Sequence, residues 1–438
     1  MTVREIALSL LAEYELGGKY VNLSLSSHRA DNLSREDRAF LTALLYTTVE
    51  RKITYDYYVR AISSRGNEKI DVTTLNILRL GMAQILDMDS IPTHAAVNET
   101  VKLTRNPGER GFVNGVLRQA ARLKESCELP LPKPEKNVAR YLSVKHSFPL
   151  WMAKHFIKMF GEEATEAIFL HYNTARYTDL TVNLAKISRE KYMDLLRENG
   201  FSPKCGISSL TVRLDESVNP RLLPGFEEGL FFVQDSASAI AAQALGTSPQ
   251  DRVVDVCACP GGKSFSAAIL AGKGGSVTSF DLHESKLSLI SEGAKRLGLS
   301  GVTVACRDAT DPADELYDSF DRVICDVPCS GLGVLAKKPD IRHKDNESLH
   351  NLPQLQLDIL NKSAHYLKKG GYMIYSTCTL NPAENEEVVA EFLRCNKGYS
   401  LCDFSVGDIS SVGGMLTLLP HIHNTDGFFI AKVKKEEI

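Results

Sequence analysis

The strongest constraint on the fold is a change of periodicity near residue 250, after which short apolar runs alternate with helical segments. Four such runs, at residues 253–256, 276–280, 302–304 and 322–325, are too short for helices and contain β-branched residues. Alternating strands and helices predict a doubly wound parallel sheet, and ligands of such sheets bind beyond the carboxyl ends of the strands. We therefore expect an α/β domain whose functional residues follow these strands.

The first 125 residues show a different pattern, because their apolar residues recur at helical spacing and predict an all-α bundle. The proline-rich residues 129–134 cannot continue a helix and indicate a linker. Between residues 145 and 235, expected helices at 151–172 and 188–199 and strands at 180–183, 210–214 and 230–233 suggest a small α+β subdomain. The expected order is a bundle (1–128), a linker (129–144), an α+β subdomain (145–235) and an α/β domain (236–438).

The composition and charge of the chain indicate where the protein works and what it binds. The 438 residues contain no run of eighteen apolar residues, and the N-terminus lacks the apolar stretch of a secretory signal, so we expect a cytoplasmic protein without membrane contact. Ten cysteines are expected to stay reduced there. The net charge of −3 argues against coating of nucleic acid through bulk electrostatics. Residues 1–145 nevertheless carry 21 Lys and Arg against 17 Asp and Glu, a modest basic excess of 4.

A glycine turn follows the first strand of the α/β domain. Two glycines let the backbone approach a ligand closely, and the helix that begins here presents free N–H groups to a carboxylate. Asp281 ends the next strand, twenty residues after Gly261, where an acidic side chain can hold ribose hydroxyls. The turn is neither Gly-x-Gly-x-x-Gly nor a complete P-loop, so a nucleoside-containing cofactor other than NAD or ATP is expected. Its residues are Cys257, Ala258, Cys259, Pro260, Gly261, Gly262 and Lys263.

Two further acidic residues stand at strand ends. Asp308 follows the third strand, where a carboxylate can accept from an adenine amino group, and Asp326 ends the fourth. Three successive strands ending in Asp281, Asp308 and Asp326 resemble the class I methyltransferases. That resemblance implies S-adenosyl-L-methionine as the cofactor and a Rossmann-like sheet.

Two cysteines lie beyond apolar runs, Cys329 in Asp-Val-Pro-Cys-Ser-Gly and Cys378 in Ser-Thr-Cys-Thr. Free cysteine is often simply buried, yet a thiolate adds readily to an electron-poor carbon and leaves again. The glycine turn at residues 257–263, the first of these motifs at 326–331, and the stretch 376–385 that contains the second resemble the RNA cytosine-5 methyltransferase family. The resemblance implies Cys378 as the nucleophile that attacks C6 of cytosine and Cys329 as the cysteine that helps release the product. Asp326 would bond the edge of the base.

The bundle in turn resembles the NusB family, through residues 96–101 and 112–118. This implies RNA binding, although Asn98 and Asn114 can equally cap or bridge packed helices. Together the two resemblances cover the whole chain and imply the bacterial members of the family that act on 16S rRNA. Nothing in the sequence demands a dimer, so we expect a monomer.

A basic segment follows the Asp326 motif and is expected to contact RNA through Lys337, Lys338, Arg342 and Lys344. An ordinary solvated loop is the alternative. His343 stands where the family is expected to carry tryptophan, which puts one stacking contact in doubt. Cys-x-Cys at 257–259 lacks a second pair of ligands, so no metal is expected.

Three other functions would leave different motifs in the sequence. A methyltransferase of exocyclic amino groups would carry an Asn or Asp-Pro-Pro-aromatic motif, which residues 326–329 do not match. A non-catalytic RNA-binding assembly factor would be favoured by loss of the thiols, Asp326 or the glycine turn, and all are present. The same chemistry on tRNA or DNA stays open, because only the NusB-like region points to ribosomal RNA.

Overall fold

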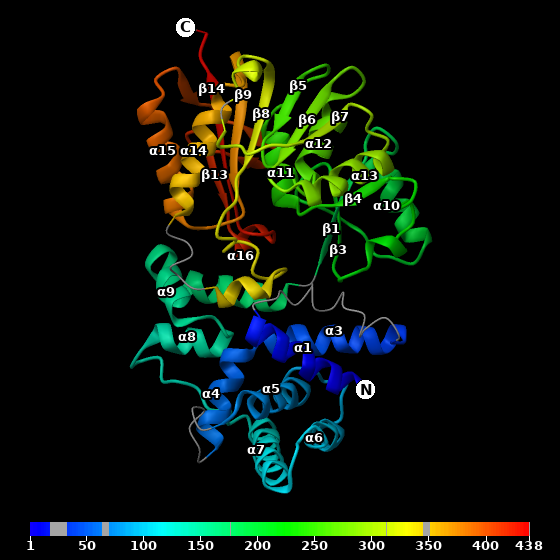
Figure 1. The fold of residues 1–438 in the computed structure, drawn as a ribbon, viewed down its shortest axis with the longest axis vertical. Helices are drawn as coiled ribbons and strands as arrows, with labels where there is room; N and C mark the ends of the chain where they lie inside the picture. Colours follow the sequence, from blue (N-terminus) through cyan, green and yellow to red (C-terminus); the bar gives the residue numbers. More distant parts are fainter. Residues whose placement is uncertain (18–32, 64–69, 176, 312, 345–350, 438) are drawn as a thin grey trace. The chain divides into compact units, whose positions relative to one another are not determined.

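The computed structural model describes residues 1–17, 33–63, 70–175, 177–311, 313–344 and 351–437. Its contacts divide the chain into two compact units (Figure 1). Unit 1 comprises Met1–Asn173 and Lys337–Lys344, and unit 2 comprises Thr174–Ala336 and Asp345–Ile438. Among the described residues, no helix has the length and apolar character needed to span a membrane.

Unit 1 is helical, as expected, and its core is built around α5 (Figure 1). Nearly every residue of α5 from Asn76 to Ile85 is buried, because α1, α3, α4, α6 and α7 pack around it. Arg79 of α5 lies inside this bundle and donates to Asp56 and Glu15, which offsets the cost of burying its charge. The helices are α1 (Val3–Gly17), α3 (Arg35–Glu50), α4 (Lys52–Ile62), α5 (Val72–Leu86), α6 (Thr93–Val101), α7 (Pro107–Glu125), α8 (Val138–His146) and α9 (Leu150–Thr174).

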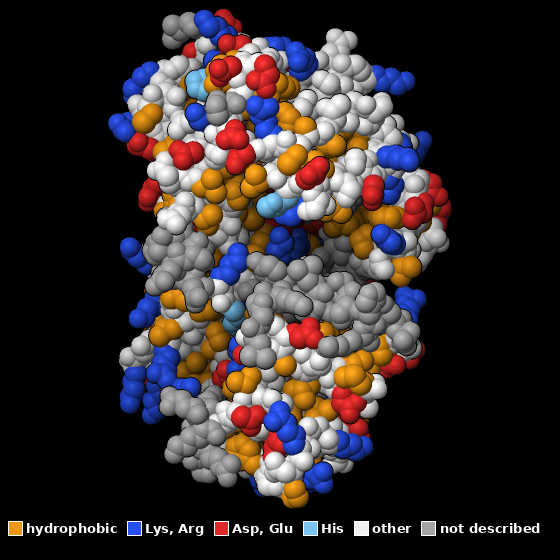
Figure 2. Space-filling view, viewed as in Figure 1, with side chains coloured by type: hydrophobic (Ala, Val, Ile, Leu, Met, Phe, Trp, Pro, Cys, Tyr) orange, Lys and Arg blue, Asp and Glu red, His pale blue; other side chains and the backbone are white. Residues whose placement is uncertain are grey.

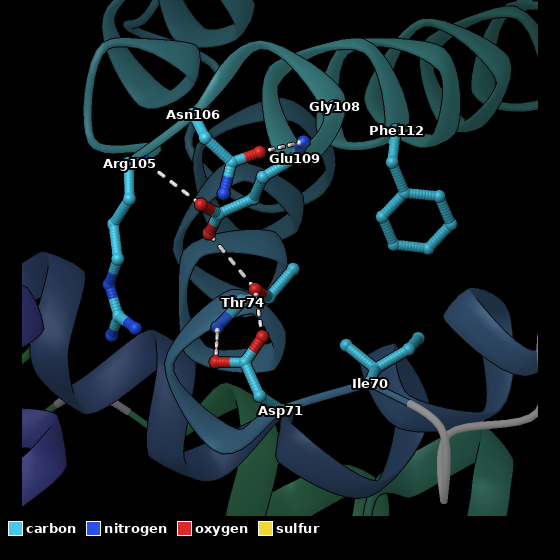
Figure 3. A pocket seen from close by; sticks show the side chains of 8 residues that line it. All are labelled: Ile70, Asp71, Thr74, Arg105, Asn106, Gly108, Glu109 and Phe112. Atoms are coloured by element: carbon cyan, nitrogen blue, oxygen red, sulfur yellow. Dashed lines mark hydrogen bonds between the residues drawn. The ribbon is translucent and has the colours of Figure 1, made fainter.

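Capping side chains fix where α5 and α7 begin (Figure 3). The Asp71 carboxylate accepts from the Thr74 amide, and the Asn106 side chain accepts from the Glu109 amide. Glu109 also accepts from the Arg105 amide at 2.8 Å and from the Thr74 hydroxyl at 2.9 Å, so it joins the two helix starts. These residues line a pocket of about 360 Å³ whose polar groups serve helix capping.

The segment expected to be a linker is only partly irregular. Residues 129–137 lie outside helices, but α8 begins at Val138 because Asn137 caps it through the Arg140 amide. Thr54 of α4 donates its hydroxyl to the Val144 carbonyl, and Phe148 stacks on Phe169 of α9. Helices α8 and α9 therefore pack with unit 1, and the contact boundary falls at Asn173 rather than within 129–144.

Unit 2 begins with the strands and the second helix of the expected α+β subdomain, whereas its first helix, α9, lies in unit 1. Its antiparallel sheet has the order β2 (Lys204–Cys205), β3 (Thr211–Leu214), β1 (Thr178–Val182) and β4 (Phe231–Val233). Helix α10 (Arg189–Glu198) covers it through Tyr192, Met193 and Leu196, which pack on Leu180, Val212 and Phe231.

The larger sheet is doubly wound, as expected, and its strand order is β10-β14-β9-β8-β5-β6-β7, with β13 beside β14 (Figure 1). Strands β5 to β9 are parallel, and β14 runs antiparallel to β9. The strands are β5 (Arg252–Asp255), β6 (Ser276–Asp281), β7 (Val302–Cys306), β8 (Phe320–Asp326), β9 (Leu367–Thr377), β10 (Tyr399–Leu401), β13 (Met415–Leu418) and β14 (Phe428–Lys435). A separate pair is formed by β11 (Ser405–Val406) and β12 (Ile409–Ser410).

Helices cover both faces of this sheet. Side chains of α14 and α15 pack with Val254, Val323 and Met373 on one face, whereas α11 and α12 pack with Val253 and Ile324 on the other. Alternate residues of each strand thus point to opposite cores, which explains why the strands read as continuous apolar runs. The helices are α11 (Ser236–Ala244), α12 (Gly262–Ala271), α13 (Leu287–Leu297), α14 (Leu352–Ala364), α15 (Glu386–Cys395) and α16 (Pro420–His423).

Candidate active site

The glycine turn joins β5 to α12 and closes on itself. The Gly261 amide donates to the Ala258 carbonyl at 2.6 Å, and the Cys259–Pro260 peptide bond is cis. Gly261 has a φ of 107°, and a Cβ there would lie 2.5 Å from the Phe265 ring. Only glycine fits this position without strain. The turn therefore brings bare backbone to the carboxyl edge of the sheet.

Asp281 is part of the turn's support. Its Oδ2 accepts from the Cys259 amide at 3.1 Å, and its Oδ1 accepts from the His283 amide at 3.0 Å. Each oxygen keeps a lone pair, because a carboxylate oxygen can accept two hydrogen bonds. Asp281 is half-buried, so these lone pairs can reach ribose hydroxyls beside the turn.

Asp308 has a local role in the structure. Its Oδ1 accepts from the amide and hydroxyl of Thr310 at 2.8 and 2.6 Å. These two donors hold the pKa of Asp308 below its usual value. The carboxylate is therefore charged near neutral pH and fixed in its loop.

Asp326 lies at the end of β8 between two donors. The Lys263 ammonium donates to its Oδ2 at 2.7 Å, and the Ser376 hydroxyl donates to its Oδ1 at 2.7 Å. Lys263 comes from the first turn of α12 and is only 7% exposed, whereas the Asp326 side chain is 32% exposed. The ion pair ties the glycine turn to β8, and it leaves the more exposed carboxylate open to a ligand.

The two thiols meet at the same edge. Strands β8 and β9 are parallel neighbours with Asp326 opposite Ser376, so the segments that follow them leave the sheet side by side. The Sγ atoms of Cys329 and Cys378 lie 3.2 Å apart. The neighbouring Cys378 sulfur and burial both hold the pKa of Cys329 well above its usual value. Cys329 is therefore the thiol that keeps its proton.

The loop after Cys378 is held closely to the loop after Cys329. The Gly333 amide donates to the Cys378 carbonyl at 2.9 Å, and the Gly427 amide donates to the Gly333 carbonyl at 2.8 Å. A Cβ at Gly333 would lie 1.9 Å from the Gly427 carbonyl oxygen, so any larger residue would force these backbones apart.

Cys257 and Cys259 pack as ordinary thiols. Burial raises the pKa of both, and that of Cys257 strongly. Within the described part of the chain, no three His, Cys, Asp or Glu side chains gather in a way that could hold a metal ion.

The basic segment differs from the expectation at one residue. Lys337 and Lys338 are exposed, but Arg342 is fully buried in unit 1. Its guanidinium donates to the Asn173 side chain at 2.8 Å and to the Tyr172 carbonyl at 3.3 Å, and lies over the Phe148 ring. Arg342 is thus used in protein packing and is not placed to contact RNA. Lys344 is half-buried.

His343 is drawn into the same packing. Its ring nitrogen lies 3.0 Å from the Val49 carbonyl, and burial lowers its pKa to about 4.

Basic and acidic side chains are interspersed on the face of the molecule in Figure 2, in keeping with the small net charge. Of the NusB-like residues, Asn98 is exposed, and Asn114 accepts from Arg118 one turn later.

The sequence did not indicate every residue of this edge. Asp255 is 1% exposed, accepts from the Ser264 hydroxyl at 2.7 Å, and has its pKa raised to about 7 by burial. Glu384 and Asn385 lie buried behind the thiols. Asp255 stands at a strand end, and Glu384 and Asn385 close the stretch 376–385 that resembles the family, but the sequence alone assigned none of the three a role.

Three parts of the chain match known protein families. Residues 242–434 match the family described as 16S rRNA methyltransferase RsmB/F. Residues 1–122 match the NusB family, and residues 148–220 match the ferredoxin-like domain of RsmF/B-like methyltransferases.

Two curated relatives align along almost the full chain. The probable ribosomal RNA small subunit methyltransferase B of Bacillus subtilis (strain 168) is 35% identical over 99% of both chains. The ribosomal RNA small subunit methyltransferase B of Proteus mirabilis (strain HI4320) is 31% identical, also over 99% of both. The crystal structure of PH0851 shares the fold, with 24% identity and a TM-score of 0.78 over 98% of this chain and 97% of that one.

Proposed function

Since the chain belongs to the RsmB/F family of 16S rRNA methyltransferases, it is an rRNA methyltransferase, and we propose that it methylates C5 of a cytosine in 16S rRNA. In this proposal the methyl donor is S-adenosylmethionine, and Cys378 forms a transient covalent bond to C6 of the base. The observation that carries the proposal is the pair of sulfur atoms 3.2 Å apart, beside the Lys263–Asp326 ion pair.

The residues at the glycine turn fit the proposed cofactor. Bare backbone at Gly261 admits close approach, Asp281 keeps lone pairs for ribose hydroxyls, and Asp308 offers a charged oxygen for an adenine amino group. S-adenosylmethionine, when bound, supplies an electrophilic methyl group on a sulfonium. The chain must then supply a nucleophilic carbon, which C5 of cytosine becomes only after addition at C6.

In this proposal the Cys329 thiol keeps its proton and the Cys378 sulfur acts as the nucleophile. A Cys329 thiol that keeps its proton can donate to the Cys378 sulfur and so favour the Cys378 thiolate. That thiolate attacks C6, and the electron pair moves toward C5 and the edge of the base. Asp326, oriented by Lys263 and Ser376, accepts a hydrogen bond from the amino group at that edge and so holds the ring in place for attack at C6.

Methyl transfer to C5 leaves a saturated C5–C6 bond with sulfur on C6. A base must then remove the C5 proton, so that the C5–C6 double bond re-forms and the bond between C6 and Cys378 breaks. A bound water serves as that base, and the Cys329 thiol, which keeps its proton, donates a hydrogen bond to the departing Cys378 sulfur. The products are 5-methylcytosine and S-adenosylhomocysteine, and the Cys378 thiolate is regenerated.

The cytosine must be unstacked to reach this edge, so a loop or single strand of rRNA is the expected substrate. The exposed side chains of Lys337 and Lys338 are proposed phosphate contacts, with Lys344 as a further one. Proposed contacts of this kind position the RNA without reading its sequence.

The test is methylation of total RNA from a deletion strain by the purified enzyme, with the methyl group of the donor labelled. Label in one cytosine of 16S rRNA supports the proposal, whereas label confined to tRNA contradicts it. Cys378→Ser should abolish labelling. Cys329→Ala should leave the enzyme covalently attached to its RNA, as a species that survives denaturing electrophoresis.

A further inference from the structure

Two consecutive buried residues, Glu384 and Asn385, hold the flanks of both thiols. They follow Cys378 at the end of a 3₁₀ turn (Pro382–Glu384), and their exposed fractions are 0% and 1%. A buried carboxylate beside a buried amide is costly unless each polar atom is bonded, so their partners reveal what they do.

Glu384 holds the loop of Cys329. Its Oε2 accepts from the Ser330 amide at 2.8 Å and from the Gln356 side chain at 3.0 Å. The same Gln356 nitrogen donates to the Pro328 carbonyl at 3.0 Å. Both neighbours of Cys329 in the chain are therefore fixed, one directly by Glu384 and the other through Gln356. The second carboxylate oxygen of Glu384 accepts from Asn381 at 3.0 Å.

Asn385 holds the loop of Cys378 in the same manner. Its Oδ1 accepts from the Thr377 hydroxyl at 2.6 Å, and its Nδ2 donates to the Thr379 carbonyl at 3.1 Å. Both neighbours of Cys378 are thereby fixed. The hydroxyls of Ser330 and Thr379, 2.7 Å apart, join the two loops directly.

The charge of Glu384 acts on one thiol in particular. Its carboxylate is among the groups that raise the pKa of Cys329, because a nearby negative charge disfavours a thiolate. The side chain thus fixes the Cys329 loop and also helps to keep its thiol protonated.

We propose that Glu384 and Asn385 are positioning residues with separate duties: Glu384 sets Cys329 for product release, and Asn385 sets Cys378 for attack on C6. This inference rests on the proposed function and adds two residues to it. It predicts that the two neighbours, one residue apart in the chain, give opposite kinetic defects when changed.

Glu384→Gln keeps the shape of the side chain but offers one acceptor oxygen where three donors converge. Losing a hydrogen bond to a charged group costs enough to slow the dependent step by on the order of 10-fold or more. Covalent enzyme–RNA adduct should therefore accumulate as it does in Cys329→Ala. Asn385→Ala should instead slow formation of the adduct by a similar factor, with no accumulation.

The experiment uses the full-length enzyme, 16S rRNA from the deletion strain and labelled S-adenosylmethionine. Adduct resistant to denaturing electrophoresis, turnover and the thermal midpoint are measured for each variant. Glu386→Gln is the matched control, because Glu386 is the next carboxylate and accepts from the Thr417 hydroxyl of β13, away from both loops. This control should form and release adduct at the normal rate.

Accumulated adduct in Glu384→Gln, with slow adduct formation in Asn385→Ala, supports the inference. If Cys329→Ala accumulates adduct but Glu384→Gln only loses turnover, the duty assigned to Glu384 is overturned while the proposed function stands. If Cys329→Ala gives no adduct, the release role falls, and the duty of Glu384 falls with it. Should Glu384→Gln not fold, Gln356→Met removes the donor shared by Glu384 and Pro328 and must itself accumulate adduct.

Discussion

Replacement of Asp255 by asparagine should make the catalytic unit more stable at alkaline pH. The carboxylate is fully enclosed, and burial raises its pKa from 3.8 to about 7, against the smaller opposing effect of the Ser264 hydroxyl. Its Oδ1 has no hydrogen-bond partner among the described residues. An ionised Asp255 is therefore a cost to the folded state.

The sign of the effect follows from the direction of the shift. Because the pKa is higher in the folded state than in the unfolded chain, the folded state binds the extra proton. The stability that this proton contributes is complete below about pH 4 and is lost as the pH rises through about 7. Asparagine resembles the protonated form at every pH.

The size can be worked out from the same shift. The pKa of Asp255 is raised by roughly three units, and about two of these units fall between pH 5 and pH 7. Each unit corresponds to about 1.4 kcal/mol in the free energy of unfolding. The free energy of unfolding of Asp255→Asn, relative to the unsubstituted protein, should therefore rise by about 3 kcal/mol between pH 5 and pH 8.5. For a unit of this size, that is a difference of roughly 6 to 12 °C in the thermal midpoint.

Scanning calorimetry at pH 5 and pH 8.5 measures this difference in thermal midpoint. The transition of the catalytic unit is the one whose midpoint rises when S-adenosylhomocysteine is added. Asp308→Asn is the control, because its gap from the unsubstituted protein should be equal at pH 5 and pH 8.5. The Thr310 donors lower the pKa of Asp308, so the stability that its carboxylate contributes is complete at both pH values and is lost only on acidification below its unfolded pKa of 3.8. An equal gap between Asp255→Asn and the unsubstituted protein at pH 5 and pH 8.5 would refute the reasoning.

Three further predictions concern the site and its surroundings. Lys263→Met removes the ammonium 2.7 Å from Asp326 and should slow adduct formation by on the order of 100-fold. Single-turnover kinetics measure this rate. A normal rate would show that the ion pair does not orient the cytosine. Arg342→Ala should leave unit 1 folded but lower its free energy of unfolding by roughly 3 kcal/mol. The fluorescence of the single tryptophan during urea unfolding measures this change. Lys338→Ala should leave that free energy unchanged and reduce the salt dependence of RNA binding by about one counterion. Diamide should oxidise the neighbouring thiols of Cys329 and Cys378 to a disulfide by removing their two hydrogen atoms. The enzyme should lose activity, dithiothreitol should restore it, and mass spectrometry should find the disulfide-linked peptide. Irreversible or absent inactivation would contradict the 3.2 Å separation of the two sulfur atoms.

The parts of the site that the sequence predicted are those set by local chain geometry. A strand that ends in a polar residue delivers it to the sheet edge whatever surrounds it, and the structure places Asp281 and Asp326 there. Gly261 takes the positive φ that its turn requires. Such features depend on a few consecutive residues.

The residues that the sequence misread depend on distant partners. Arg342 is a cation in a basic segment, which is typical of a solvated surface, yet Asn173 and Phe148, far away in the chain, enclose it. Glu384, which precedes two further acidic residues at the start of α15, was given no role from the sequence. Its donors come from α14 and from the loop after β8, and no periodicity records them.

The linker shows the same limit. Proline at 130, 132 and 134 correctly excludes a helix there, but Asn137 starts α8 within the expected linker. Whether α8 belongs to the preceding or the following part depends on the contact of Thr54 with Val144, which is a tertiary contact.

The central claim is that Cys378 bonds to the cytosine and Cys329 ends that bond. The most direct measurement is mass spectrometry of the adduct that Cys329→Ala forms with 16S rRNA, after digestion with protease and nuclease. We predict a methylated cytidine attached to the peptide that contains Cys378. A nucleotide attached to any other residue, or no cross-linked peptide from an enzyme that still binds its RNA, would contradict the account.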